Sequence, residues 1–314
     1  MIAERTVGAT RVISLVPSGT EIVAALGALD ALVGVTHECD YPAAVASLPR
    51  VTSSAVDSGA SSASIDAQVR ALSESGRPLF ALDAGDLERL APTHILTQML
   101  CDVCAVTDGD VRSVAAVLAS PPQVLPLTGR TLDGVWNDIR AVGTALERAS
   151  AADRLLNEIE VRFVRVHERL KAARASRPRV AVIEWLDPLY VAGHWTPDLV
   201  RRAGGVDVLA APGSHSVRIS VAQVRAAGPE LVIFAPCGFD VVRAEREASA
   251  LLATADWEWA RGLECWAIDG NALTSRPGPR LADAVEVIAG IVAPGVFGEP
   301  DERWARPVRQ RSSH

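Results

Sequence analysis

The residues Arg11–Pro42, RVISLVPSGTEIVAALGALDALVGVTHECDYP, carry the clearest pattern of strands and helices in this chain. The apolar run Val12–Val16 predicts a buried strand. The residues after it predict a tight turn and a helix, with the side chain of Ser18 or Thr20 as its cap. A second strand is expected over Ala31–Val35. In open parallel sheets ligands bind beyond the carboxyl ends of strands, so the polar loop after this second strand is expected to form one wall of a ligand cleft.

The order of strand, VPSGTE, helix, VGV, loop and DYP resembles the opening of the type III substrate-binding proteins. The branch in question binds cobalamin and siderophores, and includes the B12-binding component of ABC importers. The resemblance extends over about Arg11–Pro294. It implies an α/β fold in which two Rossmann-like lobes are joined by one long helix, with a ligand cleft between the lobes.

The rest of the chain fits this expected division. Strand-like apolar runs alternate with helical patterns in both halves, as in parallel sheets covered by helices. Between the halves, Leu155, Ile159, Phe163, Val166 and Leu170 follow helical spacing in a long charged segment. We expect an N-terminal α/β lobe over 10–150, a linking helix over 151–177 and a C-terminal α/β lobe over 178–294. The polar tail over 295–314 is expected to be poorly ordered.

Composition excludes some classes of partner. The 314 residues carry a net charge of −7, which argues against nucleic acid as a ligand because phosphate binding requires concentrated positive charge. No segment reaches the length of about 18 apolar residues that spans a membrane. Met1–Thr10 shows neither an apolar signal segment nor a lipoprotein anchor, so a cytoplasmic location is expected. The alternative is a periplasmic or extracytoplasmic protein whose signal has been removed.

Several cysteines follow predicted strands of the first half. The chain has five cysteines, an odd number that fits a reducing compartment. His37, Cys39, Cys101 and Cys104 would face one cleft if their strands are parallel, and one imidazole with three thiols is a workable set of ligands for a soft metal. Loop packing without metal, ligation of zinc or of corrinoid cobalt, and a redox pair of Cys101 with Cys104 all stay open.

The second half offers a matching set of side chains in loops after strands. Trp185, Trp195, His215 and Phe239 lie in these loops, although only 4% of the chain is aromatic. Flat aromatic faces suit a large planar or macrocyclic ligand, while core packing is the alternative for each of them. In Thr274–Arg280, proline and glycine could direct Arg276 toward polar ligand groups. The alternative there is a solvated arginine at a helix start.

Together these features predict non-catalytic binding of a cobalamin-type corrinoid or a related metal chelate, with siderophore or haem as the second reading. The expected ligand-binding residues are Pro17, Ser18, His37, Glu38, Gln98, Trp185, Trp195, His215, Phe239 and Arg276, and the expected metal ligands are Cys39, Cys101 and Cys104 with His37. An ABC permease is the partner that the resemblance implies. However, Ser47–Arg50 lacks the acid that docks such proteins onto a permease, which favours a cytosolic relative. The alternative function is a zinc or iron thiolate protein, or an enzyme, that uses His37, Cys39, Cys101 and Cys104.

Overall fold

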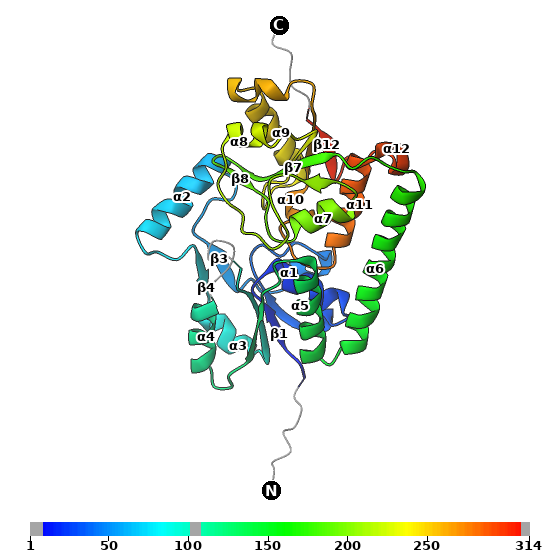
Figure 1. Cartoon of the computed structure of the whole chain (residues 1–314). Coiled ribbons are helices and arrows are strands. Elements are labelled where there is room, and N and C mark those ends of the chain that lie inside the picture. The colour runs from blue at the N-terminus through cyan, green and yellow to red at the C-terminus, as the bar shows by residue number, and fades with distance from the viewer. Residues whose placement is uncertain (1–8, 101–107, 309–314) are drawn as a thin grey trace. The chain divides into compact units, whose positions relative to one another are not determined.

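The structure of the chain is a computed structural model, which describes residues 9–100 and 108–308 (Figure 1). The chain forms two compact units, and neither is continuous in sequence. The first comprises Met1–Asp57, Ala71–Thr128 and Trp136–Leu155, and the second comprises Ser58–Arg70, Gly129–Val135 and Leu156–His314.

The first unit is built on a four-stranded parallel sheet with the order β2-β1-β5-β6. Its strands are β1 (Val12–Ser14), β2 (Leu32–Val35), β5 (His94–Gln98) and β6 (Gln123–Leu127). Ser14 pairs with Val35 on one side and with Leu96 on the other, so the carboxyl ends of three strands lie at one edge. The segments that leave this edge contain Pro17, His37 and Gln98, which the sequence places in the candidate site.

Helices and a two-stranded antiparallel sheet complete the first unit. Strands β3 (Thr52–Ser54) and β4 (Phe80–Leu82), which are far apart in sequence, form this small sheet. The other elements are helices α1 (Pro17–Ala25), α3 (Ala84–Leu90) and α4 (Asp108–Val117), with 3₁₀ turns at Leu29–Ala31 and Ala43–Ser47. A buried cluster of apolar side chains from the parallel sheet, the helices and the segments beside them forms the core, with Ile13, Leu15, Val51, Leu87, Leu90, Ile95, Val111 and Ala115.

Three helices contain the boundaries between the units. They are α2 (Ser62–Glu74), α5 (Leu132–Ala145) and α6 (Ala149–Ala172). The 24-residue helix α6 is the long amphipathic helix that the sequence predicts.

The second unit is built on a larger mixed sheet with the order β12-β11-β10-β7-β8, and β9 pairs with β7. Its strands are β7 (Arg179–Leu186), β8 (Leu189–Val191), β9 (Val206–Asp207), β10 (Leu231–Phe234), β11 (Glu264–Ile268) and β12 (Ala305–Pro307). Strands β9, β7, β10 and β11 are parallel, while β8 and β12 are antiparallel to their neighbours. The central strand β10 is buried on both faces, as its continuous apolar run requires.

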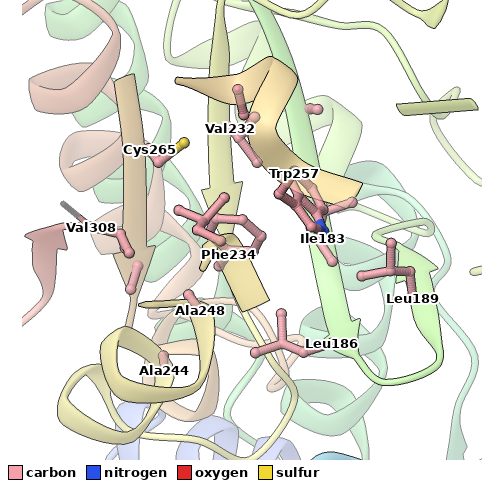
Figure 2. Packing of buried hydrophobic residues seen from close by; sticks show 14 of the residues in the cluster. Ile183, Leu186, Leu189, Val232, Phe234, Ala244, Ala248, Trp257, Cys265 and Val308 are labelled. Carbon is pink, nitrogen blue, oxygen red and sulfur yellow. The ribbon is translucent and has the colours of Figure 1, made fainter. Parts of the chain in front are cut away.

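Helices cover this sheet. They are α7 (Thr196–Arg202), α8 (Val221–Ala226), α9 (Val241–Leu252), α10 (Gly270–Leu273), α11 (Leu281–Val292) and α12 (Pro294–Phe297), with a 3₁₀ turn at Ala255–Ala260. Figure 2 shows part of the core, where Phe234 and Trp257 lie with their ring centroids 5.7 Å apart, close to Ile183 and Val232. Burial of such large side chains contributes about 1.5–3 kcal/mol each to the free energy of unfolding.

The fold class predicted from the sequence is confirmed as a mixed α/β fold with parallel sheets and a long helix. The expected division of the chain differs from the observed one at 58–70 and 129–135, which belong to the second unit. The expectation of a poorly ordered tail from residue 295 is wrong for α12 and β12. Strand β12 pairs with β11, and Arg169 donates a hydrogen bond to the carbonyl oxygen of Val296. The position of a ligand cleft between the lobes stays a prediction.

Candidate functional site

The loop after β2 presents His37 at the edge of the first unit's sheet. The loop is fixed by backbone hydrogen bonds, because the amide of Thr36 donates to the carbonyl oxygen of Ser14 and the amide of Cys39 donates to that of Thr36. His37 is half-buried, and its ring centroid lies 5.7 Å from that of Phe80 in β4. The imidazole therefore lies between the edge of the parallel sheet and the two-stranded sheet of the same unit.

Two threonine hydroxyls hold one nitrogen of this ring. The Nδ1 atom of His37 lies 2.8 Å from Oγ1 of Thr52 and 3.3 Å from Oγ1 of Thr36, and the two hydroxyls lie 2.8 Å apart. The amide of His37 also donates to Oγ1 of Thr52, at 3.1 Å. One consistent assignment has Nδ1–H donating to Thr52, whose hydroxyl donates to Thr36. Among the described residues no hydrogen bond engages Nε2, which then carries the lone pair.

The electrostatic surroundings favour the neutral imidazole. Burial lowers the pKa of His37 below its usual value, and the positive charge of Arg50 lowers it further. The Arg50 guanidinium is fixed nearby by a hydrogen bond from Nη1 to the carbonyl oxygen of Thr36. A neutral imidazole with one nitrogen held by a hydroxyl is the form in which histidine binds metals.

The surroundings of Cys39, a predicted metal ligand, and of Glu38 beside it differ from those of His37. Cys39 is buried, with Sγ 3.0 Å from Oγ1 of Thr20, and Glu38 is exposed. Cys101 and Cys104 lie outside the described residues. Within residues 9–100 and 108–308 no group of three or more histidine, cysteine or acidic side chains converges on a common point. The four-ligand metal site therefore stays a prediction.

The first turn of α1 brings Pro17 and Ser18 to the same sheet edge. Pro17 occupies the first helical position and is half-buried, while Ser18 is buried. The predicted side-chain cap is wrong, because Val16 is the N-cap residue and no side chain caps the helix. A proline at this position needs no cap for its missing N–H. Gln98 ends β5 and is half-buried.

The aromatic residues predicted in the second unit lie mainly in its core. Phe239 is 2% exposed and lies beneath the guanidinium of Arg243, 3.4 Å from the ring centroid. Trp185 is half-buried and packs edge-on against Phe239 with ring centroids 5.4 Å apart. Trp195 is buried and donates from Nε1 to the carbonyl oxygen of Thr274, at 2.9 Å. These contacts favour core packing for Phe239 and Trp195, and leave part of Trp185 accessible.

Arg276 is also enclosed by the second unit. Its side chain is 4% exposed, and Nη2 donates to Oδ1 of Asn271 at 2.8 Å. Arg276 therefore stabilises the segment between α10 and α11.

His215 belongs to a polar cluster that the sequence indicated only in part. His215 is exposed, and its Nε2 lies 2.9 Å from Nη1 of Arg130. The ring of His194 lies 5.8 Å from that of His215, and the Nε2 atom of His194 is buried without a hydrogen-bond partner among the described residues. Because a guanidinium can only donate, Nε2 of His215 is the acceptor in this contact.

Burial and nearby positive charge both favour the neutral form of His194. Burial lowers its pKa, and the positive charges of His215, when that ring is protonated, and of Arg130 lower it further. The backbone of His194 is held in the left-handed region, with φ +54°, by hydrogen bonds of its amide to Ser214 and of the Gly213 amide to its carbonyl. Arg130 was missed because its segment, Gly129–Val135, joins the second unit from a distant part of the sequence.

Comparison with known proteins agrees with this architecture. Residues 111–256 match the profile of the family described as periplasmic binding protein. A periplasmic heme-binding protein from Pseudomonas aeruginosa aligns with a TM-score of 0.71 and 19% identity, over 97% of this chain and 99% of that one. The periplasmic vitamin B12-binding protein BtuF of Vibrio cholerae aligns with a TM-score of 0.63 and 20% identity, over 90% of this chain and 96% of that one. The periplasmic heme-binding protein HutB of Vibrio cholerae aligns with a TM-score of 0.63 and 20% identity, over 91% of this chain and 100% of that one.

A search of curated protein sequences gave no match. Within the described part of the chain, no helix has both the length and the apolar character needed to cross a bilayer. The cytoplasmic location expected from the sequence is not supported, since the similar structures are described as periplasmic. The resemblance found in the sequence is confirmed: residues 111–256 match the periplasmic binding protein family, and the chain has the type III periplasmic binding protein fold.

Proposed function

We propose that this protein binds a metal tetrapyrrole without transforming it, and that His37 offers Nε2 to the metal. The observation that carries the proposal is the hydrogen bond between Nδ1 of His37 and Oγ1 of Thr52, at 2.8 Å. A metal-binding histidine usually donates from its other nitrogen to a fixed acceptor, which sets both the tautomer and the ring orientation.

The residues around His37 fit such a ligand. Burial and Arg50 keep its pKa low, so the lone pair on Nε2 is not lost to a proton near neutral pH. If a tetrapyrrole is bound, its metal would supply a coordination site for the Nε2 lone pair of His37. The chain's own contribution is to hold the ring in place and to keep it neutral.

The similar structures support the ligand class rather than one ligand. Two of them are described as heme-binding and one as vitamin B12-binding. Within this class, a cobalamin-type corrinoid as the ligand is a prediction. An ABC permease as the partner that receives the ligand is also a prediction. Non-catalytic binding is supported by the family match to periplasmic binding proteins.

The experiment that tests the proposal is a parallel absorption titration of the purified protein with hemin, hydroxocobalamin and a ferric trihydroxamate. We expect saturable binding of hemin or hydroxocobalamin with a shifted ligand spectrum, because an imidazole on the metal changes its electronic transitions. Saturable binding of the trihydroxamate alone, or of none of the three at tens of micromolar, would contradict the proposal.

A further inference from the structure

The second unit contains a cavity of about 650 Å³ that includes none of the candidate site residues. Its lining residues come from the C-terminal half of α6, the segment that follows it and the end of α7. A cavity of this size is typical of small-molecule sites in proteins. Five cationic side chains line it, together with two carboxylates: Lys171, Arg174, Arg177, Arg201 and Arg202, with Glu160 and Glu168.

Two of these cations are at least partly neutralised. Arg201 donates from Nη2 to Oδ1 of Asp198, at 2.6 Å. Arg202 reaches Oε1 of Glu160 only at 3.5 Å, and its Nε is buried without a hydrogen-bond partner among the described residues. A buried guanidinium N–H without a partner costs free energy, which an acceptor in the cavity would recover.

The positive charges of the other three cations are offset by few acidic or backbone partners. Among the described residues no ion pair engages Lys171 or Arg174, and Arg177 donates to the backbone oxygen of Gly205 at 3.3 Å. Elsewhere on the same helix, Arg162 binds both Asp283 and Glu286, at 2.5 and 2.7 Å. The cavity therefore concentrates positive charge in a chain whose net charge is −7.

The negative partial charges at two helix C-termini offset part of this positive charge, but not all of it. Helices α6 and α7 both end beside the cavity, and each C-terminus carries about half a negative charge that favours cations. Those partial charges together equal about one carboxylate. Lys171, Arg174 and Arg177 still outnumber the remaining lining carboxylate, Glu168.

The cavity also has an apolar surface. Val164 is 50% exposed, and Leu170 is half-buried beside Gly204. A Cβ atom at Gly204 would lie 2.7 Å from Cδ1 of Leu170, and its φ of +98° also favours glycine. The ends of the two helices thus approach closely, and Val164 and Leu170 supply apolar surface to the cavity, which we call its apolar floor.

We propose that this cavity binds a small organic anion that carries at least two phosphate or carboxylate groups on an apolar or planar body. Arginine binds such groups through paired N–H donors, and lysine adds a mobile charge. The apolar floor would contact the body of the ligand. This site shares no residue with the one that contains His37, and neither proposal depends on the other.

The test uses calorimetry on the full chain without a tetrapyrrole, with pyrophosphate, ATP and adenosine as probes at an ionic strength of about 0.15 M. We expect ATP to bind more tightly than pyrophosphate, and adenosine not to bind. The variant Lys171→Glu/Arg174→Glu should weaken ATP binding by a factor of about ten or more. The control Arg165→Glu/Arg246→Glu changes the net charge equally at exposed positions outside the cavity, and should leave the affinity within about twofold.

Three results would overturn the inference: no saturable ATP binding, equal binding of adenosine, or equal loss in the control variant. Equal affinity for pyrophosphate and ATP would also contradict it, because the apolar floor would then contribute nothing. If the charge-reversed variant does not fold, Lys171→Gln/Arg174→Gln decides instead, with the same expected direction.

Discussion

At the scale of single residues, Thr52 positions His37 although it lies 15 residues further along the chain. The change Thr52→Val removes the hydroxyl but nearly keeps the side chain's shape. The ring then loses the group that fixes Nδ1, so the affinity for the tetrapyrrole that binds the unaltered protein should fall about tenfold. The measurement is an absorption titration of both proteins with that ligand.

The matched control is Thr97→Val in the same unit. The hydroxyl of Thr97 is buried without a hydrogen-bond partner among the described residues. Its replacement by a methyl group should leave ligand affinity unchanged and leave the free energy of unfolding equal or higher. If Thr52→Val and Thr97→Val bind the ligand equally well, Thr52 does not position the imidazole.

Asp207 should make the stability of the protein depend on pH. Burial raises its pKa to about 6, although its Oδ1 accepts hydrogen bonds from the amides of Leu209 and Ala210, and its Oδ2 is buried without a partner among the described residues. Because the folded state holds this proton more tightly, its stabilising effect is fully present below pH about 4 and is lost as pH rises through about 6. A shift of about 2 pH units corresponds to about 3 kcal/mol.

Denaturant unfolding at pH 4.5 and at pH 7.5, for the protein and for Asp207→Asn, measures this effect. The free energy of unfolding should fall less between the two pH values in the variant, since its amide does not titrate. An identical pH dependence in both proteins would show that Asp207 is not the responsible group.

How far the sequence predicts the site is clear from individual residues. His37 and His215 were found because they follow predicted strands, and the structure leaves His37 half-buried and His215 exposed. Trp195 and Phe239 follow the same rule but are buried, since strand-end position does not determine the direction of a side chain. Thr52 and Arg130 carry no local pattern, because their roles depend on contacts between distant segments.

At the scale of elements, Gly19 lets α1 approach the sheet beside the candidate site. A Cβ atom there would lie 2.7 Å from Oγ of Ser14 and 3.1 Å from Cβ of Leu96. The change Gly19→Ala should therefore lower the free energy of unfolding by about 1–3 kcal/mol, as overpacking does. Denaturant unfolding measures the loss.

Gly295→Ala, in helix α12, is the control for the general effect of adding a methyl group. No atom lies within 4 Å of a Cβ at that position, so the free energy of unfolding should stay equal or rise slightly. If Gly19→Ala is as stable as Gly295→Ala, the close approach of α1 to the sheet is not a tight constraint.

Elements were predicted better than their ends. The strand, helix, strand order of Arg11–Val35 was correct, because apolar runs and proline are local signals. The predicted side-chain cap of α1 was wrong, because the helix begins with a proline and no side chain caps it. Strand β12 was missed because the segment that forms it is short and Arg-rich, and pairs with β11 from about 40 residues away.

At the scale of the whole molecule, the fold class followed from repeated α/β alternation, but the composition of the units did not. Residues 58–70 join the second unit through side chains of α9. Glu247 accepts hydrogen bonds from Ser62, and Arg243 donates to the carbonyl oxygen of Ser58 at 2.5 Å. These partners lie about 185 residues apart in sequence, a separation at which local patterns carry no information.

The most direct test of the central claim, that His37 binds the metal of a tetrapyrrole, is the ligand's absorption spectrum in His37→Ala with and without added imidazole. His94→Ala is the matched control, since His94 is half-buried in the same unit and its Nδ1 also lies 2.8 Å from a threonine hydroxyl, that of Thr93. We expect His37→Ala to lose the spectral shift, free imidazole to restore it, and His94→Ala to behave as the unaltered protein. An unchanged spectrum in His37→Ala would show that His37 does not bind the metal.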